Sequence, residues 1–96
     1  MKFYHATTKD NAIAIMADGI IKRGLDGVFF CKDPHDACKF LLLRGVRDIA
    51  VITVDLNEDE VEESFDHSEA FFQCKAYTHY DDVKLNGTEK FTLYHF

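Results

Sequence analysis

The sequence predicts one compact α+β domain, residues 1–96, whose two helices lie in the N-terminal half. Helix start and stop signals occur twice before residue 46, and strand-like runs dominate the rest of the chain. This order is typical of α+β folds and differs from the regular alternation of a doubly wound sheet. With 47% hydrophobic and 14% aromatic residues, a chain of this length can build one core, and no linker or repeat divides it.

Capping residues indicate the first strand and helix. The stretch KFYHA, residues 2–6, favours a short strand. Thr8 is suited to cap the start of a helix over residues 9–18, and Gly19 to cap its end. The apolar spacing in this helix predicts one buried face, formed by Ile13, Met16 and Ala17 and widened by Ala12 and Ile15.

The stretch GVFFCKDPHDACKF, residues 27–40, predicts a strand followed by a sharp helix start. Asp33-Pro34 supplies an N-cap and a proline at the first helical position, so we expect a helix to about residue 43, with Phe40 facing inward. Neighbouring residues in a strand face opposite sides, so one of Phe29 and Phe30 belongs to the core and the other to a cleft. We assign Phe29 to the cleft.

The second half of the chain contains the remaining strands. IAVITVDL, residues 49–56, is rich in β-branched residues and predicts a central strand. A further strand is expected over residues 70–77, which include FFQCKAY. Residues 83–85 and 91–96 are also expected to be strands, and the turn signal Asn86-Gly87 between them predicts a hairpin.

Charge and targeting signals exclude several classes of protein. A net charge of −6 argues against a general nucleic-acid binder and against docking on anionic membranes. The N-terminal residues lack the apolar segment of a signal peptide, and no apolar run approaches the roughly 18 residues of a membrane span. Together with an odd number of cysteines, these features predict a cytoplasmic protein with reduced thiols and no membrane partner.

The cysteines and histidines raise the alternative of a metal site. Cys31, His35 and Cys38 form the tightest cluster, but the paired C-x2-C spacing of a structural zinc site is missing. We therefore expect no metal, and expect these cysteines to be small buried hydrophobic residues.

Several features occur in an order that suits a dinucleotide site. His5 lies within the first strand, the aromatic pair follows a glycine, and Glu69 immediately precedes the run FFQCKAY. A histidine can hydrogen-bond a ribose hydroxyl, and an aromatic ring can stack on a cationic nicotinamide. A carboxylate can stabilise the positive charge that develops when a glycosidic bond breaks.

The stretches YHAT, DGI and GVFFCKDPHDACKF, within about residues 3–85, resemble the His motif, the helix and the Gly-x-Tyr-Phe strand of the ADP-ribosyltransferase superfamily. The resemblance is to the branch of poly-ADP-ribose polymerases and DNA-targeting toxins. It implies a split antiparallel or mixed sheet, with NAD as the substrate. It also implies transfer of ADP-ribose to an unknown acceptor, a protein or a nucleic acid.

The resemblance further implies roles for single residues. His5 matches the family's histidine and would hold a ribose, with Thr7 beside it. Phe29, where the family has tyrosine, and Phe40 would sandwich the nicotinamide, while Glu69 matches the catalytic glutamate by position. Because Phe29 lacks the hydroxyl, a reduced relative that binds NAD or ADP-ribose without turnover is also open. The carboxylate has two alternatives, Glu63 and Asp66.

A second hypothesis comes from a different class of protein. Residues 57–63 carry five of the 17 acidic residues, a pattern typical of a solvated loop or helix face. The same cluster would suit a small non-catalytic inhibitor, of phage or toxin–antitoxin type, that covers the basic site of a partner.

Overall fold

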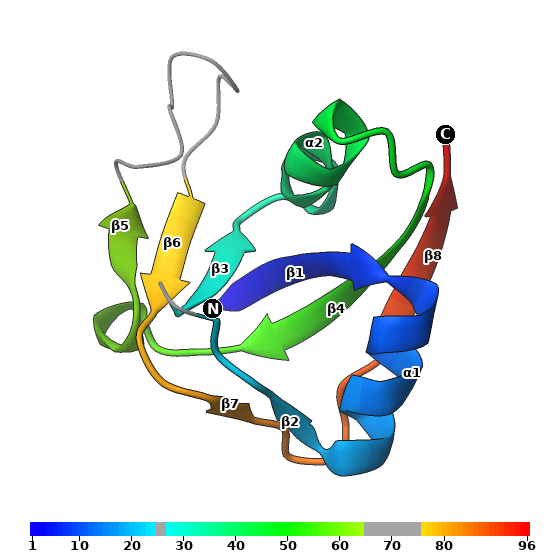
Figure 1. The fold of residues 1–96 in the computed structure, drawn as a ribbon. Helices are drawn as coiled ribbons and strands as arrows, with labels where there is room; N and C mark the ends of the chain where they lie inside the picture. The colour runs from blue at the N-terminus through cyan, green and yellow to red at the C-terminus, as the bar shows by residue number, and fades with distance from the viewer. Residues whose placement is uncertain (25–26, 65–75) are drawn as a thin grey trace.

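A six-stranded sheet, a two-stranded sheet and two helices make up the parts of the chain that the computed structural model describes, residues 1–24, 27–64 and 76–96 (Figure 1). The large sheet has the order β5-β6-β3-β1-β4-β8, β2 pairs with β7, and all these pairings are antiparallel. The predicted compact α+β domain is thus confirmed. The elements are β1 (Lys2–Thr8), α1 (Lys9–Asp18), β2 (Ile20–Ile21), β3 (Val28–Cys31), α2 (Pro34–Leu43), β4 (Asp48–Asp55), the short 3-10 helix η1 (Glu58–Glu60), β5 (Glu62–Ser64), β6 (Ala76–His79), β7 (Val83–Lys84) and β8 (Phe91–His95).

Helix α1 has the predicted bounds and both predicted caps. The Thr8 hydroxyl accepts a hydrogen bond from the Asn11 amide at 3.2 Å, and Gly19 ends the helix in the left-handed conformation at φ 71°. The predicted buried face is wrong in part, because Ile13 is 50% exposed. The expectation for Ala12 is confirmed, because its side chain is fully buried and its small size permits close approach to the sheet.

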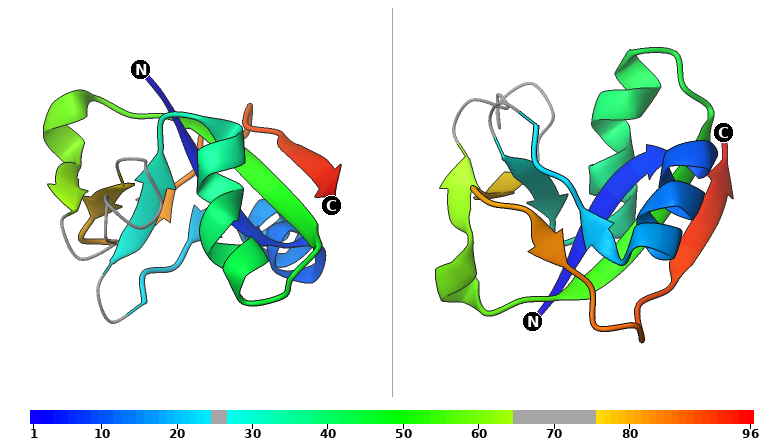
Figure 2. Two further views of the ribbon diagram at one scale, coloured as in Figure 1. Left: turned by 90° about the horizontal axis from the view of Figure 1, so that it is seen from above. Right: turned by 60° about the horizontal axis from the view of Figure 1, so that its bottom comes forward.

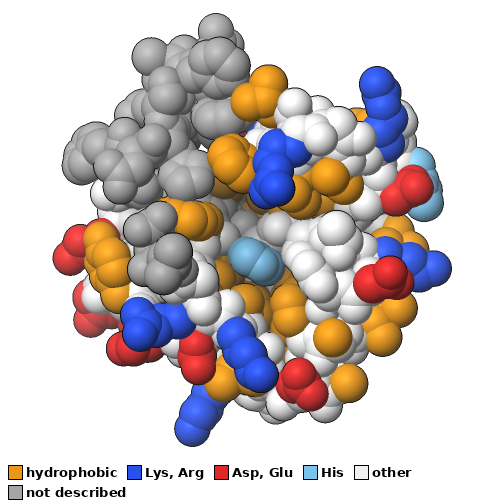
Figure 3. Space-filling model, viewed as in Figure 1, with side chains coloured by type: hydrophobic (Ala, Val, Ile, Leu, Met, Phe, Trp, Pro, Cys, Tyr) orange, Lys and Arg blue, Asp and Glu red, His pale blue; other side chains and the backbone are white. Residues whose placement is uncertain are grey.

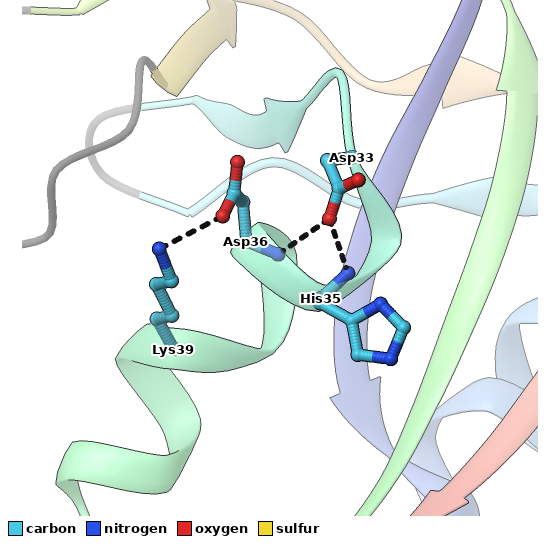
Figure 4. Close-up of polar contacts among 4 residues, drawn as sticks. All are labelled: Asp33, His35, Asp36 and Lys39. Atoms are coloured by element: carbon cyan, nitrogen blue, oxygen red, sulfur yellow. Dashed lines mark hydrogen bonds and ion pairs between the residues drawn. The ribbon is translucent and has the colours of Figure 1, made fainter.

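Helix α2 also begins and ends where the sequence predicts. The Asp33 carboxylate accepts hydrogen bonds from the amides of His35 and Asp36, at 2.9 and 3.1 Å (Figure 4). One turn on, Lys39 forms an ion pair with Asp36 at 2.9 Å. The expectation that Phe40 faces inward is wrong, because its side chain is 42% exposed.

The two helices cover opposite faces of the β1–β4 pair, and each face has its own core. Phe3 and alternate β4 residues pack with α1, whereas Tyr4 and the other β4 residues pack with α2. Successive side chains of a strand point to opposite sides, which explains the division. The α2 core contains fully buried Cys38, and the α1 core continues to Phe30 and β7.

The predicted hairpin between residues 83–85 and 91–96 is wrong. Strand β7 pairs with β2, and β8 pairs with β4 at an edge of the large sheet. The right panel of Figure 2 shows the β2–β7 pair in front of the large sheet. Gly87 still turns the chain, at φ 93°, and the Glu89 carboxylate accepts hydrogen bonds from the Asn86 and Gly87 amides.

The structure describes only part of one predicted strand. Of the predicted strand within 70–77, residues 70–75 lie outside the described residues, and β6 begins at Ala76. Within the acidic run, which was expected to be a solvated loop or helix face, η1 is a short exposed helix, whereas the strand β5 was not expected. In the described segments, no helix has both the length and the apolar character needed to cross a lipid bilayer.

Candidate functional site

The strands β1 and β3 meet at a single register pair. Strand β1 pairs with β4 along its whole length, but it meets β3 only where Tyr4 lies opposite Cys31. Beyond that pair, the His5 side chain connects the two strands, because its Nδ1 lies 2.9 Å from the carbonyl oxygen of Phe29. A side-chain hydrogen bond thus takes the place of the backbone ladder at this point of the sheet.

The surroundings of His5 favour its neutral form. The side chain is half-buried, and its ring centroid lies 5.7 Å from that of Phe30. Burial lowers the pKa of His5 below its ordinary value, and the hydrogen bond to the Phe29 carbonyl offsets this only in part. Because a carbonyl only accepts, Nδ1 carries the proton and Nε2 keeps its lone pair. The described parts of the chain supply no second hydrogen bond to this ring.

The ring beside His5 belongs to Phe30, which corrects the assignment of Phe29 to a cleft shared with His5. The pairing of Tyr4 with Cys31 puts His5 and Phe30 on one face of the sheet and turns Phe29 to the other. Phe30 is only 1% exposed and forms part of the core. Phe29 contacts His5 through its backbone carbonyl, which accepts the hydrogen bond from Nδ1.

The other predicted site residues lie apart from one another. Thr7 is buried and shares the face of His5, two residues along β1. Phe40 lies on the surface of α2, where the Arg44 guanidinium is 5.9 Å from its ring centroid. Glu69 and Asp66, two of the three candidate carboxylates, lie outside the described residues.

The third candidate carboxylate, Glu63, lines a shallow pocket of about 310 Å³. Figure 3 shows one face of the molecule, with a histidine in a hollow near its centre and acidic side chains along its left margin. The residues that line the pocket at Glu63 come from β1, the β3–α2 connection, the acidic segment and β6. The pocket residues are Phe3, Lys32, Glu58, Val61, Glu63 and Tyr77.

A cation–aromatic contact organises this pocket. Lys32 Nζ lies 4.9 Å from the centroid of the Tyr77 ring and 3.4 Å from Glu58 Oε1, while Tyr77 packs edge-on against Phe3 at 5.6 Å. Desolvation alone would lower the pKa of Lys32, but its interactions with Tyr77 and Glu58 outweigh this and raise it. Lys32 therefore remains an ammonium at neutral pH. The sequence analysis missed this cluster, because no local pattern joins residues so far apart in the chain.

The metal and thiol alternatives gain no support. Among residues 1–24, 27–64 and 76–96, no three His, Cys, Asp or Glu side chains come together in a way that could hold a metal ion. Cys38 is fully buried, and this burial, followed by the charge of Asp33, raises its thiol pKa to about 11. A protonated thiol is a poor nucleophile and a poor ligand, so Cys38 acts as a small core residue, as predicted. The same expectation is wrong for Cys31, which is only half-buried.

Comparisons with protein-family models, with curated proteins and with solved structures found no match to this chain. Its class is therefore given by its architecture. It is an α+β domain in which an antiparallel sheet separates two helices, with a neutral histidine where two strands part and an acidic, aromatic pocket nearby on the same face.

Proposed function

We propose that the protein binds NAD or a related ADP-ribose compound at His5 and is an ADP-ribosyltransferase or a reduced relative of one. The observation that carries the proposal is the hydrogen bond from His5 Nδ1 to the Phe29 carbonyl. It holds the imidazole in one tautomer and leaves Nε2 as an acceptor for a hydroxyl of the ribose. A neutral, oriented acceptor of this kind suits recognition of a sugar.

The parting of β1 and β3 supports the same proposal. The central strands β1 and β3 share one register pair, so the backbone ladder between them ends beside His5. This is the feature expected of a split sheet, which the sequence resemblance implies. Thr7, on the same face, adds a hydroxyl within two residues of His5.

Transfer would need a carboxylate near the ribose. In the proposed reaction the bond between the ribose and nicotinamide breaks, and nicotinamide leaves with the bonding electrons. The acceptor then forms a bond to the same ribose carbon and loses a proton to water. Glu69 is proposed to stabilise the oxocarbenium-like transition state, with Glu63 and Asp66 as alternatives. Phe40 lies exposed on α2, which covers the face of the sheet opposite to His5, so it has no part in this proposed site.

The hypothesis of an acidic inhibitor is less well supported. Three carboxylates of the acidic segment interact within the chain itself. Glu58 pairs with Lys32, Glu60 accepts a hydrogen bond from the Asn57 amide at 3.2 Å, and Glu62 accepts one from the Tyr80 hydroxyl at 3.1 Å. These contacts give three of the acidic residues a role within the fold, so their presence does not require a basic partner protein.

Calorimetric titration with NAD tests the proposal. His5→Asn is the informative variant, because the asparagine amide can still donate to the Phe29 carbonyl but offers nothing at the position of Nε2. We expect saturable binding by the native protein and a loss of at least about tenfold in affinity for His5→Asn, the range of one lost polar contact. His35→Ala, an exposed histidine on α2, is the matched control and should bind as the native protein does. Equal affinity in all three proteins, or no binding at millimolar NAD, would overturn it.

A further inference from the structure

The pocket beside Tyr77 already holds a positive charge. The Lys32 ammonium sits over the Tyr77 ring, 4.9 Å from its centroid, and beside the Glu58 carboxylate. An aromatic face attracts a cation through its quadrupole, and an adjacent carboxylate adds Coulomb attraction. The position of Lys32 Nζ therefore marks a place in the pocket where a cation is stabilised.

The lining of the pocket suits a positive charge at the position of the Lys32 ammonium. The charged groups of the lining are the carboxylates of Glu58 and Glu63 and the ammonium of Lys32, and Glu58 is the carboxylate paired with that ammonium. The remaining walls are the Tyr77 ring and the apolar side chains of Phe3 and Val61. An anion would meet two like charges here, whereas a cation with a small apolar body would find both charge and contact area complementary.

Lys32 can leave this position at little cost. Its side chain is 43% exposed and its partner Glu58 is 64% exposed, so their ion pair lies in the range of surface pairs, about 0–1 kcal/mol. The four-carbon stem can swing the ammonium into water. The raised pKa keeps Lys32 charged at neutral pH, so it competes with any external cation for the same position.

We propose that this pocket binds an organic cation that carries a guanidinium or a primary ammonium group. The cation takes the place of the Lys32 ammonium over the Tyr77 ring and beside Glu58 and Glu63. Lys32 is then an internal competitor that weakens the site, and its removal strengthens binding. This site is separate from the proposed NAD site at His5, and the proposal does not depend on whether the protein binds NAD.

A nuclear magnetic resonance titration with methylguanidinium chloride tests the site. We expect saturable shifts of the backbone amides in residues 58–63 and 76–79. Methylurea, a neutral molecule of similar shape, and sodium chloride at equal ionic strength should give no saturable shifts there. The absence of saturable shifts with methylguanidinium, or the same shifts with methylurea, would overturn the proposal.

Two substitutions should change the affinity in opposite directions. Lys32→Met removes the competing charge but keeps the apolar stem, and should tighten methylguanidinium binding by about two- to fivefold. Glu58→Gln keeps the shape of the lining but removes one carboxylate, and should weaken binding by a similar factor. Lys39→Met removes a lysine whose ion pair with Asp36 lies on α2, so it should bind as the native protein does. Unchanged affinity in both pocket variants would contradict the proposal.

The cation could be a free amine or a basic side chain of another protein, and two probes distinguish these sources. Agmatine represents the free compound, and a short peptide with one central arginine and blocked ends represents the side chain. Binding of both supports a pocket that admits a side chain, and binding of agmatine alone supports a small-molecule site. If neither shifts the pocket amides, the proposal fails.

Discussion

His5 Nδ1 donates a hydrogen bond to the backbone carbonyl of Phe29 across the place where β1 and β3 separate, at 2.9 Å. Two consequences follow. The imidazole is fixed in the tautomer that leaves Nε2 as an acceptor, and the strand β3 is attached to β1 by a side chain just beyond their last register pair. The histidine therefore contributes both to the fold and to the proposed site.

The first prediction concerns acid stability. Burial lowers the pKa of His5 in the folded protein, so the unfolded chain binds a proton more readily. The contribution of neutral His5 is fully present above the unfolded value of about 6.5 and is lost as pH falls through the folded pKa. Urea unfolding at pH 7.5 and 5.5 should therefore show a larger loss of stability for the native protein than for His5→Asn. A similar loss in both proteins would contradict the account of His5.

The second prediction concerns Gly27, which immediately precedes β3. Its φ of 97° strains any other residue, and an added Cβ would lie 2.5 Å from the carbonyl oxygen of His79. Gly27→Ala should lower the free energy of unfolding by about 2 to 4 kcal/mol. Gly45→Ala is the matched control, because its φ is 85° but nothing lies within 4 Å of the new Cβ. It should cost only about 1 kcal/mol in urea denaturation. Equal losses would show that the close approach to His79 does not matter.

Local signals predicted the helices well. The caps Thr8, Gly19 and Asp33 work through hydrogen bonds within a few residues, so the sequence alone contains the information. Strand partners depend on the competition between distant segments, and this information is not local. Asn86-Gly87 does turn the chain, yet β7 finds β2 and β8 finds β4.

The candidate site shows the same limit. Alternation along β3 correctly predicted that Phe29 and Phe30 face opposite ways, but not which of them faces His5. That choice depends on the register between β1 and β3. The Lys32–Tyr77 contact joins β6 to the β3–α2 connection, so no spacing in the sequence could have indicated it.

The third prediction concerns the start of α2. Asp33→Ala removes the acceptor of two amide hydrogen bonds and should cost about 1 kcal/mol of unfolding free energy. Asp33→Asn keeps an acceptor oxygen at the cap and should cost clearly less. Thermal and urea unfolding measure both changes. A loss as large in the asparagine variant would mean that charge, and not capping, is the dominant contribution.

The fourth prediction concerns Cys38. With Cys31 and Cys74 replaced by serine, the remaining thiol should react with iodoacetamide at pH 8 about 100-fold more slowly than a free thiol, because its pKa lies near 11 and not at 9.0. Burial slows the reaction further. In urea above the unfolding transition, the rate should rise to that of a free thiol. Fast modification of the folded protein would contradict the buried, protonated state.

The central claim is that His5 offers Nε2 to a ribose hydroxyl, and imidazole nitrogen resonances report this directly. In uniformly ¹⁵N-labelled protein at pH 7.5, we predict a protonated Nδ1 and an unprotonated Nε2 for His5. Saturating NAD should then shift the Nε2 resonance in the direction of an accepted hydrogen bond and leave Nδ1 protonated. A proton on Nε2 in the free protein, or an Nε2 resonance that does not respond to NAD, would contradict the account.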